Sequence, residues 1–580
     1  MLVDNDLRKD LKLRVRVTLI IIYVLYGVLL VNLFVLQVYQ AEKYTLLSDK
    51  NRVKLAPILP KRGRIITSDG KFVATSSYKY RLLMDLCDEK SFNEGMITIN
   101  KYLDLTDQEK QRILDSKKKS RPYVVIKEDL SWNEYAKISM ILFKLNHVFI
   151  ENIYVRNYSM PLEFSHILGY TSKSNNDIQI LTGKSGIEFS CDDRLTGKTG
   201  NIQTEINATG KKIRIISKTE PTNGTDVVIT INSGLQKYVY DLIAQEKAGA
   251  CVVIDMSNAE ILSMVSVPGF DSNLISGGMS KNQWKSIINN PLFPLMNRVV
   301  SCTYPPGSIF KIVVAFAALS EGIISPHYRV FCSGGIKQDG HVFHCWNRRG
   351  HGSVNLYDAI RLSCDCYFFE ISKRLGINSI IKYAEKFGFG SETGIELPNE
   401  SVGLLPTKEW KFLKYGTSWK RYETMITSIG QGAFLSTLMQ AAVMIGRIYT
   451  DNYNFFPTLI KNGRKKLPIA PMDRTHSDVI KNALYQVCAT GTASGSCQTE
   501  YGISGKTGSS QVRKIKSNDV GISQKNFEWK YRDHAFFVGS APHNNPRYIV
   551  AVFIEHGRSG ASVAAPIARK IFDKLMVGKI

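Results

Sequence analysis

The stretch Tyr304-Pro305-Pro306-Gly307-Ser308-Ile309-Phe310-Lys311 opens the most informative segment of this 580-residue chain. It runs directly into residues 312–319, Ile-Val-Val-Ala-Phe-Ala-Ala-Leu, which leave no polar side on a helix. A helix that is apolar all round is a buried one, and Pro-Pro-Gly is typical of a helix start. The stretch therefore predicts a central buried helix with Ser308 on its first turn.

The spacing of Ser308 and Lys311 suits nucleophilic catalysis. Residues three apart lie on one face of a helix, so the amine could accept the hydroxyl proton of the serine. The N-terminus of the helix adds N–H donors that stabilise an oxyanion. Alone, this Ser-x-x-Lys pattern occurs by chance in many proteins and is more often a capping serine beside a surface lysine.

Two further motifs favour catalysis. Ser363-Cys364-Asp365 follows the helix, and Lys506-Thr507-Gly508 comes later, just before Ser509. This order matches the Ser-x-x-Lys, Ser-x-Asn and Lys-Thr-Gly set of serine acyl-enzymes. A second Lys-Thr-Gly occupies residues 198–200, before Ser308, where we expect a turn without a neighbouring strand.

Apolar runs on both sides of the motifs predict one antiparallel sheet. The runs occupy residues 227–231, 250–254, 261–267, 535–538 and 548–554. Helices are expected after a cap at Asn232 or Ser233, and near the C-terminus, where Ile567, Ile571 and Leu575 keep helical spacing. Strands at both ends of a domain must pair, so we predict an α+β fold with helices on the sheet and a helical insertion between its first and last strands.

A membrane span is predicted near the N-terminus. Residues 17–36 contain no charged side chain, and about twenty helical residues cross a hydrocarbon core of roughly 30 Å. Five basic residues precede the span, against Lys43 after it: Arg8, Lys9, Lys12, Arg14 and Arg16. The positive-inside rule predicts a cytoplasmic tail and an exported remainder. A cleaved signal peptide is the alternative, but Val38-Tyr39-Gln40 is too bulky for a small-x-small cleavage site.

The remaining organisation follows from composition. We expect a tail at residues 1–16, an anchor at 17–38, a mixed α+β pedestal at 39–220 and the catalytic domain at 221–580. The pedestal is polar and rich in turn signals such as Ser68-Asp69-Gly70, which predicts an irregular spacer. The net charge of +24 is scattered and accompanies no reading module, so we expect no nucleic-acid partner and a role near anionic lipid and wall polymers.

Together, these motifs resemble the class B penicillin-binding proteins, most closely the elongation-type penicillin-binding protein 2. The similarity extends over nearly the whole exported part. Further matching residues are Arg52, Pro57, Arg62-Gly63, Asp69-Gly70, Gly186-Ile187-Glu188, Ser428-Ile429-Gly430-Gln431-Gly432, Asp533-His534-Ala535 and Glu555-His556-Gly557. Asp365 replaces the Asn of the wider superfamily, as it does in elongation-type relatives, and Ser509 stands where Thr is common.

The resemblance implies a pedestal domain followed by a peptidoglycan D,D-transpeptidase domain of serine β-lactamase-like fold. Ser308 would attack the penultimate D-Ala carbonyl of a stem pentapeptide with Lys311 as base. Ser363, in the motif completed by Asp365, would relay the proton with Lys506 to the departing D-Ala. An amine from a neighbouring stem would then resolve the acyl-enzyme.

Substrate binding and partners also follow from the resemblance. Thr507, followed by Gly508, would hold the terminal carboxylate, and the N–H groups of Ser308 and Ser509 would form the oxyanion hole. The resemblance implies inhibition by β-lactams, no cofactor for catalysis, and a location in the bacterial inner membrane with a periplasmic catalytic domain. It also implies two partners, a lipid-II-polymerising SEDS-type glycosyltransferase and elongation scaffold proteins.

Three other functions share part of this pattern. A β-lactamase uses the same motifs, but the anchor and the long pedestal argue against it. A wall-machinery scaffold with a vestigial site conflicts with the complete motifs. A division-type transpeptidase is the nearest alternative, because both subtypes carry the same catalytic residues.

Four residues near the second motif suit a structural zinc site: Cys332, Cys345, His351 and Cys364. Three thiolates and one imidazole fit tetrahedral zinc. Ser363 and Asp365 should face the cleft, so Cys364 between them should point away and could bind a metal behind the site. The alternatives are a disulfide from Cys332 to Cys345, unlinked buried thiols, or a ligand set that includes Cys366 or His344.

Overall fold

The computed structural model describes residues 4–42, 53–85, 89–117, 123–145, 147–173, 180–206, 212–463, 468–513 and 523–578. Lys43 and Arg52 lie outside the described residues. The chain forms two compact units, one of residues 1–60 and 197–223 and the other of residues 61–196 and 224–580.

The first unit holds the predicted span and a small sheet. Helix α1 (Asp4–Phe34) continues into a π-helical turn, η1 (Val35–Tyr39). Residues 9–39 form a helix that is long and apolar enough to cross a membrane. The sheet has the strand order β1-β8-β9, with β1 (Val53–Ile58), β8 (Gly200–Ile206) and β9 (Lys212–Thr219) all antiparallel.

The Lys-Thr-Gly at residues 198–200 belongs to this small sheet. Lys198 bridges to Thr222, and Gly200 begins β8 opposite Ile58 of β1. The prediction of a turn without a neighbouring strand is therefore wrong. The flanking glycine and asparagine suggested a turn, but backbone pairing with strands distant in the sequence places the triad at a strand start.

The part of the pedestal that lies in the second unit is more regular than expected. A five-stranded sheet joins β10, β2, β3 and β4 in that order, with β5 also paired to β3. Its strands are β2 (Ile65–Ile66), β3 (Phe72–Asp85), β4 (Tyr123–Leu130), β5 (Val148–Tyr158) and β10 (Val227–Val228). A separate apolar core packs beneath α3 (Glu89–Asn100), α4 (Asp107–Lys117) and α5 (Trp132–Ile141).

A buried charge cluster stabilises the same region. Both carboxylate oxygens of Glu188 accept hydrogen bonds, from Arg62 Nε at 2.7 Å and from Arg156 Nε at 2.6 Å. Arg62 also donates to two backbone carbonyls, and Arg156 to the carbonyl of Gly63. Because all three side chains are buried, loss of one partner would leave an uncompensated charge. The Arg62 and Glu188 matches are therefore structural.

The catalytic domain contains the predicted antiparallel sheet, in the order β12-β11-β19-β18-β17. The strands are β11 (Gly249–Asp255), β12 (Glu260–Val267), β17 (Ser504–Ser510), β18 (His534–Ala541) and β19 (Tyr548–Ile554). Early and late segments meet at the β11–β19 pairing. The run at 227–231 differs from expectation, because its strand, β10, pairs in parallel with β2 of the pedestal sheet.

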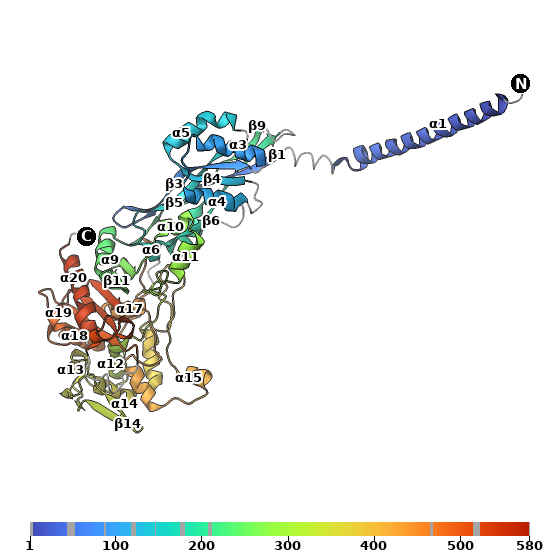
Figure 1. The fold of residues 1–580 in the computed structure, drawn as a ribbon. Coiled ribbons are helices and arrows are strands. Elements are labelled where there is room, and N and C mark those ends of the chain that lie inside the picture. Colours follow the sequence, from blue (N-terminus) through green and yellow to red (C-terminus); the bar gives the residue numbers. More distant parts are fainter. Residues whose placement is uncertain are drawn as a thin grey trace. The chain divides into compact units, whose positions relative to one another are not determined.

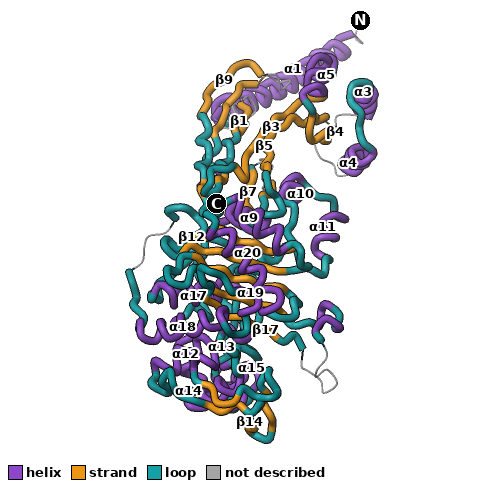
Figure 2. Tube along the Cα trace, turned by 90° about the vertical axis from the view of Figure 1, so that its left-hand side faces the viewer, coloured by secondary structure: helices purple, strands orange, loops and turns teal. Residues whose placement is uncertain are grey.

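Helices cover both faces of this sheet, so nearly every strand residue is buried. Helices α9 (Ser233–Ile243) and α20 (Ala565–Met576) contact each other on one face, and α17 (Leu438–Thr450) packs against β11, β18 and β19. Figure 1 shows green α9 beside red α20, and in Figure 2 the orange strands lie next to these helices. Asn232 caps α9 through Leu235 N, as predicted.

The insertion between β12 and β17 is helical. Its centre is α12 (Lys311–Ser320), in which every residue before Ser320 is buried. Around it pack α14 (Asp365–Lys386) and α18 (Arg474–Ala489). The central helix predicted from the apolar run is therefore present, and it carries the Ser-x-x-Lys motif at its start.

Candidate active site

Ser308 lies in a 3₁₀ turn, η3 (Gly307–Ile309), that leads directly into α12. Residues three apart eclipse one another in a 3₁₀ turn, which brings Ser308 and Lys311 to the same side. Gly307 has φ +57°, and a Cβ there would lie 2.7 Å from the carbonyl oxygen of Ser509. Only glycine therefore lets the nucleophile turn approach β17 this closely.

Lys311 is completely buried at the centre of the second motif. Its Nζ donates to Ser363 O at 2.8 Å, to Ser363 Oγ at 3.2 Å and to Asp365 Oδ1 at 2.6 Å. The ion pair with Asp365 and the two hydrogen bonds to Ser363 hold the amine between the first and the second motif, in a position to pass protons to the Ser363 hydroxyl.

The second motif occupies the turn between α13 (Leu356–Arg361) and α14. Ser363 has φ +55°, a conformation that costs free energy in a residue other than glycine and that turns its hydroxyl toward Lys311. Asp365 begins α14, and its second oxygen accepts a hydrogen bond from the backbone N–H of Trp346 at 2.8 Å. Asp365 thus ties the catalytic lysine to the loop that carries Cys345.

The third motif lies on strand β17. Lys506 is completely buried, and burial lowers its pKa well below the usual lysine value, with the nearby charge of Lys311 acting in the same direction. Thr507 shares a hydrogen bond with Thr492 at 3.0 Å. Ser509 is exposed, and its carbonyl accepts a hydrogen bond from Gln431.

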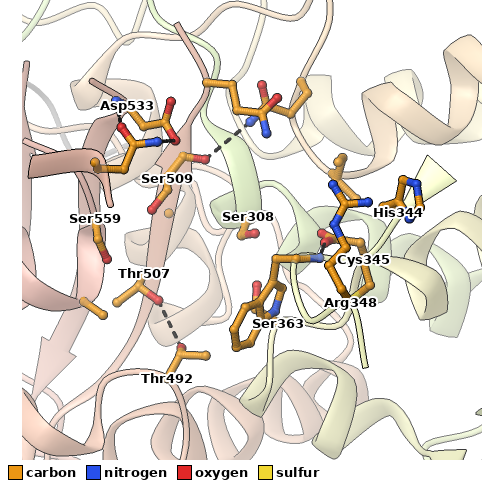
Figure 3. A pocket seen from close by; sticks show the side chains of 18 of the residues that line it. Ser308, His344, Cys345, Arg348, Ser363, Thr492, Thr507, Ser509, Asp533 and Ser559 are labelled. Carbon is orange, nitrogen blue, oxygen red and sulfur yellow. Dashed lines mark hydrogen bonds between the residues drawn. The ribbon is translucent and has the colours of Figure 1, made fainter. Parts of the chain in front are cut away.

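A cleft of about 800 Å³ brings the three motifs together. Ser308, Ser363, Asp365, Thr507, Gly508 and Ser509 all line it. In Figure 3, Ser308 lies between Thr507 and Ser509 on the strand side and Ser363, Cys345 and Arg348 on the loop side. The arrangement presents a serine nucleophile and the hydroxyl of Ser363 to one space, and the buried Lys311 donates to that hydroxyl.

A buried network supports the nucleophile turn from behind. Arg298 Nε and Nη2 reach the carboxylate of Glu555 at 3.1 and 3.2 Å, and Tyr304 donates to the same carboxylate at 2.5 Å. Burial raises the pKa of Tyr304, which therefore stays a donor. Tyr304 and Glu555 belong to segments that resemble the family pattern, but they are 251 residues apart, and no local pattern predicts their contact.

Several cleft residues carried no usable sequence signal. Thr492 lies in an ordinary small-residue turn, and Trp346 contributes only its backbone N–H to Asp365. Arg348 is a rim residue whose position depends on the loop. Asp533 was noted within a matching segment, and the structure places it in the cleft, where burial raises its pKa to about 6.

The four predicted metal ligands converge behind the second motif. Their donor atoms all lie within 4.8 Å of one another, and His351 Nδ1 is 3.6 Å from Cys332 Sγ and 3.5 Å from Cys345 Sγ. Tetrahedral zinc with ordinary bond lengths requires a sulfur–nitrogen separation of about 3.6 Å. The residues therefore fit zinc in both chemistry and spacing.

The alternative ligands differ in position. Hydrogen bonds from the Cys364 and Cys366 thiols lower the pKa of Cys345, so Cys366 lies beside the cluster. His344 is exposed in the short strand β15 (His341–His344) at the rim of the cleft. Cys332 and Cys345 are not joined in the structure, where all nine described cysteines are free.

Comparison with known families finds two matches. Residues 249–573 match the penicillin-binding protein transpeptidase domain, and residues 57–229 match the penicillin-binding protein dimerisation domain. Peptidoglycan D,D-transpeptidase MrdA of Acinetobacter baumannii is 33% identical over 570 residues, covering 93% of this chain and 84% of that protein.

Solved structures of penicillin-binding proteins are also similar to this chain. Penicillin-binding protein PBP2 of Helicobacter pylori, in a complex with MreC, superposes with a TM-score of 0.82 at 27% identity, covering 91% of this chain and 99% of that one. A component of a peptidoglycan synthase complex that coordinates polymerisation and cross-linking superposes with a TM-score of 0.70 at 26% identity, covering 98% of this chain and 99% of that one.

Proposed function

The chain belongs to the penicillin-binding protein transpeptidase family, and we propose that it cross-links peptidoglycan stem peptides during cell elongation through an acyl-enzyme at Ser308. One observation carries this proposal: three motifs far apart in the sequence meet in one cleft around Ser308. The similarity to MrdA and PBP2 favours the elongation role over the division role. The complete set of motif residues, with Ser308 on the cleft and Lys311, Ser363 and Lys506 buried, argues against a vestigial scaffold.

The two lysines divide the proton transfers between them. Lys311 forms an ion pair with Asp365, whereas burial lowers the pKa of Lys506 and favours its neutral form. When Ser308 attacks the penultimate D-Ala carbonyl, its proton passes to Lys311 as Lys311 gives one, through Ser363 Oγ, to Lys506. Lys506 then protonates the departing D-Ala amine, so no net proton is lost.

Substrate contacts follow from the same geometry. Thr507, fixed by Thr492, offers its hydroxyl to the terminal carboxylate of the donor. The backbone N–H groups of Ser308 and Ser509 would stabilise the tetrahedral oxyanion. An amine of a second stem peptide attacks the acyl-enzyme, forms the cross-link and releases Ser308.

Penicillin labelling tests this assignment. Intact-mass analysis after treatment with benzylpenicillin should show one adduct per chain, and Ser308→Ala should remove it. Ser559→Ala, which changes another serine lining the same cleft, should keep the adduct. Labelling that persists in Ser308→Ala would assign the nucleophile elsewhere.

The role in elongation implies protein partners. The complex with MreC and the synthase complex concern similar proteins, and they support a scaffold protein and a lipid-II polymerase as partners of this chain. The pedestal offers exposed aromatic side chains for such contacts: Tyr78, Trp132 and Phe143. Co-purification from cells should recover elongation components. Recovery of division components alone would favour the division role.

Orientation in the membrane is also part of the proposal. Five basic residues precede the apolar helix, which favours a cytoplasmic tail and a periplasmic catalytic domain. Protease added outside spheroplasts should digest the chain after about residue 40. Full protection of the catalytic domain would reverse the orientation, and a soluble product lacking the helix would indicate cleavage.

We also propose that Cys332, Cys345, His351 and Cys364 hold a structural zinc ion. Bound zinc would supply a cross-link between the loop of Cys345 and the start of α14. Cys345 immediately precedes Trp346, whose N–H holds Asp365. The four ligands would therefore fix the backbone that positions Asp365 against Lys311.

Metal analysis tests the zinc proposal. The purified chain should contain close to one zinc, and chelation should lower its melting temperature, because a ligand that binds only the folded state stabilises it. Cys345→Ser should reproduce this loss, whereas Cys251→Ser, in buried strand β11, should retain the metal. Absence of metal together with a Cys332–Cys345 disulfide in non-reducing mass spectra would replace zinc with the disulfide.

A further inference from the structure

The active-site cleft extends past Ser509 to an end that carries a carboxylate. Ser510 of β17 pairs with His534 of β18, so Asp533 stands at the neck where the two strands separate. Asp533 lines the same cleft as Ser308, together with Gln511 and Gln524. In Figure 3 it lies beyond Ser509, on the side of Ser509 away from Thr507.

Among the described residues, the hydrogen bonds to the Asp533 carboxylate come from neutral groups. Gln524 Nε2 donates to Oδ2 at 3.1 Å, Gln524 Oε1 accepts from the backbone N–H of Asp533 at 3.1 Å, and the backbone N–H of Val512 donates to the carboxylate. Arg513 influences it through space while its guanidinium lies 4.4 Å above the Phe527 ring.

The charge state leaves this carboxylate able to bind a cation. Burial raises its pKa only to about 6, so Asp533 is mostly ionised at neutral pH. A partly buried carboxylate with two neutral donors still has free lone pairs directed to an approaching group. A charge-assisted hydrogen bond from an ammonium would satisfy them.

The proposed reaction supplies such a cation. The acceptor amine belongs to a stem peptide, and donor and acceptor stems are the same polymer unit, so the donor carries that side-chain amine as well. A cleft of about 800 Å³ is roughly 10 Å across, a distance that about three extended residues span. The donor amine therefore has to lie within reach of the cleft walls when Ser308 attacks.

We propose that Asp533, oriented by Gln524, forms a subsite for the side-chain ammonium of the donor stem peptide. Thr507, at the middle of β17, holds the terminal carboxylate, and Asp533, beside the Ser510 end of that strand, holds the ammonium. The donor is then selected by a charge at each end. This subsite rests on the proposed transpeptidase function.

The test uses two pentapeptides that differ only in whether the side-chain amine is free or acetylated. Each peptide is titrated against a fluorescent penicillin, and the concentration that halves labelling of Ser308 is measured. The free-amine peptide should protect wild-type protein at about tenfold lower concentration than the acetylated one, as expected for one charge-assisted hydrogen bond. If the two peptides protect the wild-type protein at nearly equal concentrations, that result alone overturns the proposal.

Variants assign the effect to Asp533. Asp533→Asn should reduce the ratio between the peptides to about one, and Asp533→Glu should restore most of it. The matched control is Asp573→Asn. Asp573 lies on α20, its carboxylate accepts a hydrogen bond from the hydroxyl of Tyr501, and its replacement should keep the wild-type ratio. A full ratio in Asp533→Asn, or equal weakening of both peptides with the ratio retained, would limit Asp533 to holding the strand neck. If the fluorescent penicillin does not label Ser308 of the wild-type protein at all, the transpeptidase function itself is contradicted.

Discussion

The two Lys-Thr-Gly triads of this chain have the same residues and different structures. Lys198 and Thr199 are exposed at the entry to β8, in the three-stranded sheet of the first unit. Lys506 and Thr507 are buried within β17, an edge strand of the five-stranded sheet that carries the catalytic cleft. The two glycines also differ: a Cβ at Gly200 would strike Thr219 O at 2.2 Å, and one at Gly508 would lie 3.0 Å from Pro306 O.

This contrast shows that the triad acquires its chemistry from its neighbours. Water solvates Lys198, whereas burial, together with the nearby charge of Lys311, lowers the pKa of Lys506 and favours its neutral amine. Gly200 permits pairing within its own sheet. Gly508 permits the nucleophile turn to approach the strand, so only the second glycine affects the position of Ser308.

Among the paired replacements, those of the two lysines should give the largest difference in the rate of penicillin acylation. Lys506→Ala should reduce the rate of penicillin acylation by about 10³-fold or more, because a relay amine inside the cleft is lost. Lys198→Ala should change that rate by less than about twofold, as expected for an exposed side chain. Stopped-flow acylation of both proteins, with folding checked by circular dichroism, measures the difference. Equal losses would contradict the assignment of Lys506.

Replacement of the two glycines should give a smaller difference. The methyl group of Gly508→Ala should push the Pro306–Ser308 turn by a few tenths of an ångström and slow acylation about tenfold. Gly200→Ala should disturb the β8–β9 pairing and leave the acylation rate nearly unchanged. Acylation rates and melting curves of both variants separate the two effects. If Gly200→Ala slows acylation while its melting curve stays like that of the wild type, the claim that only Gly508 affects the position of Ser308 is wrong.

Replacement of Lys506 should raise the stability of the folded protein, although it lowers the activity. The folded protein lowers the pKa of Lys506, so between that lowered value and the ordinary lysine pKa the unfolded chain binds more protons. Stability contributed by this residue therefore rises with pH across that window. Lys506→Met should melt a few degrees higher than wild type at pH 7, and the gap should narrow as the pH approaches about 10.

The matched variant Lys198→Met sharpens this test. Because Lys198 is exposed, its replacement should shift the melting temperature by less than about one degree at either pH. Calorimetry of Lys506→Met and of Lys198→Met, each at pH 7 and at about pH 10, gives the melting temperatures to be compared. A Lys506→Met protein that melts below wild type at pH 7 would show that Lys506 contributes favourable contacts that exceed its desolvation cost.

Local sequence pattern was sufficient for the regular elements of the catalytic domain. The runs at 250–254, 261–267, 535–538 and 548–554 all became strands of one sheet, and the apolar segment after Ser308 became α12. Buried strands and helices need long apolar runs, and such runs are visible without any tertiary information. The pedestal strands were missed because they are half exposed, and polar residues interrupt their apolar pattern.

By itself, the sequence determined the nucleophile motif, the order of the three motifs, the apolar N-terminal helix and the residues able to bind zinc, because each depends on residue type and short-range spacing. The order of the motifs already favoured Lys506 over Lys198. Tertiary structure alone decided that Lys506 is completely buried, that Asp365 pairs with Lys311, and that Asp533 enters the cleft. These features depend on burial and on contacts between segments far apart in the chain. Such contacts set the protonation of a lysine or carboxylate, and no local pattern records them.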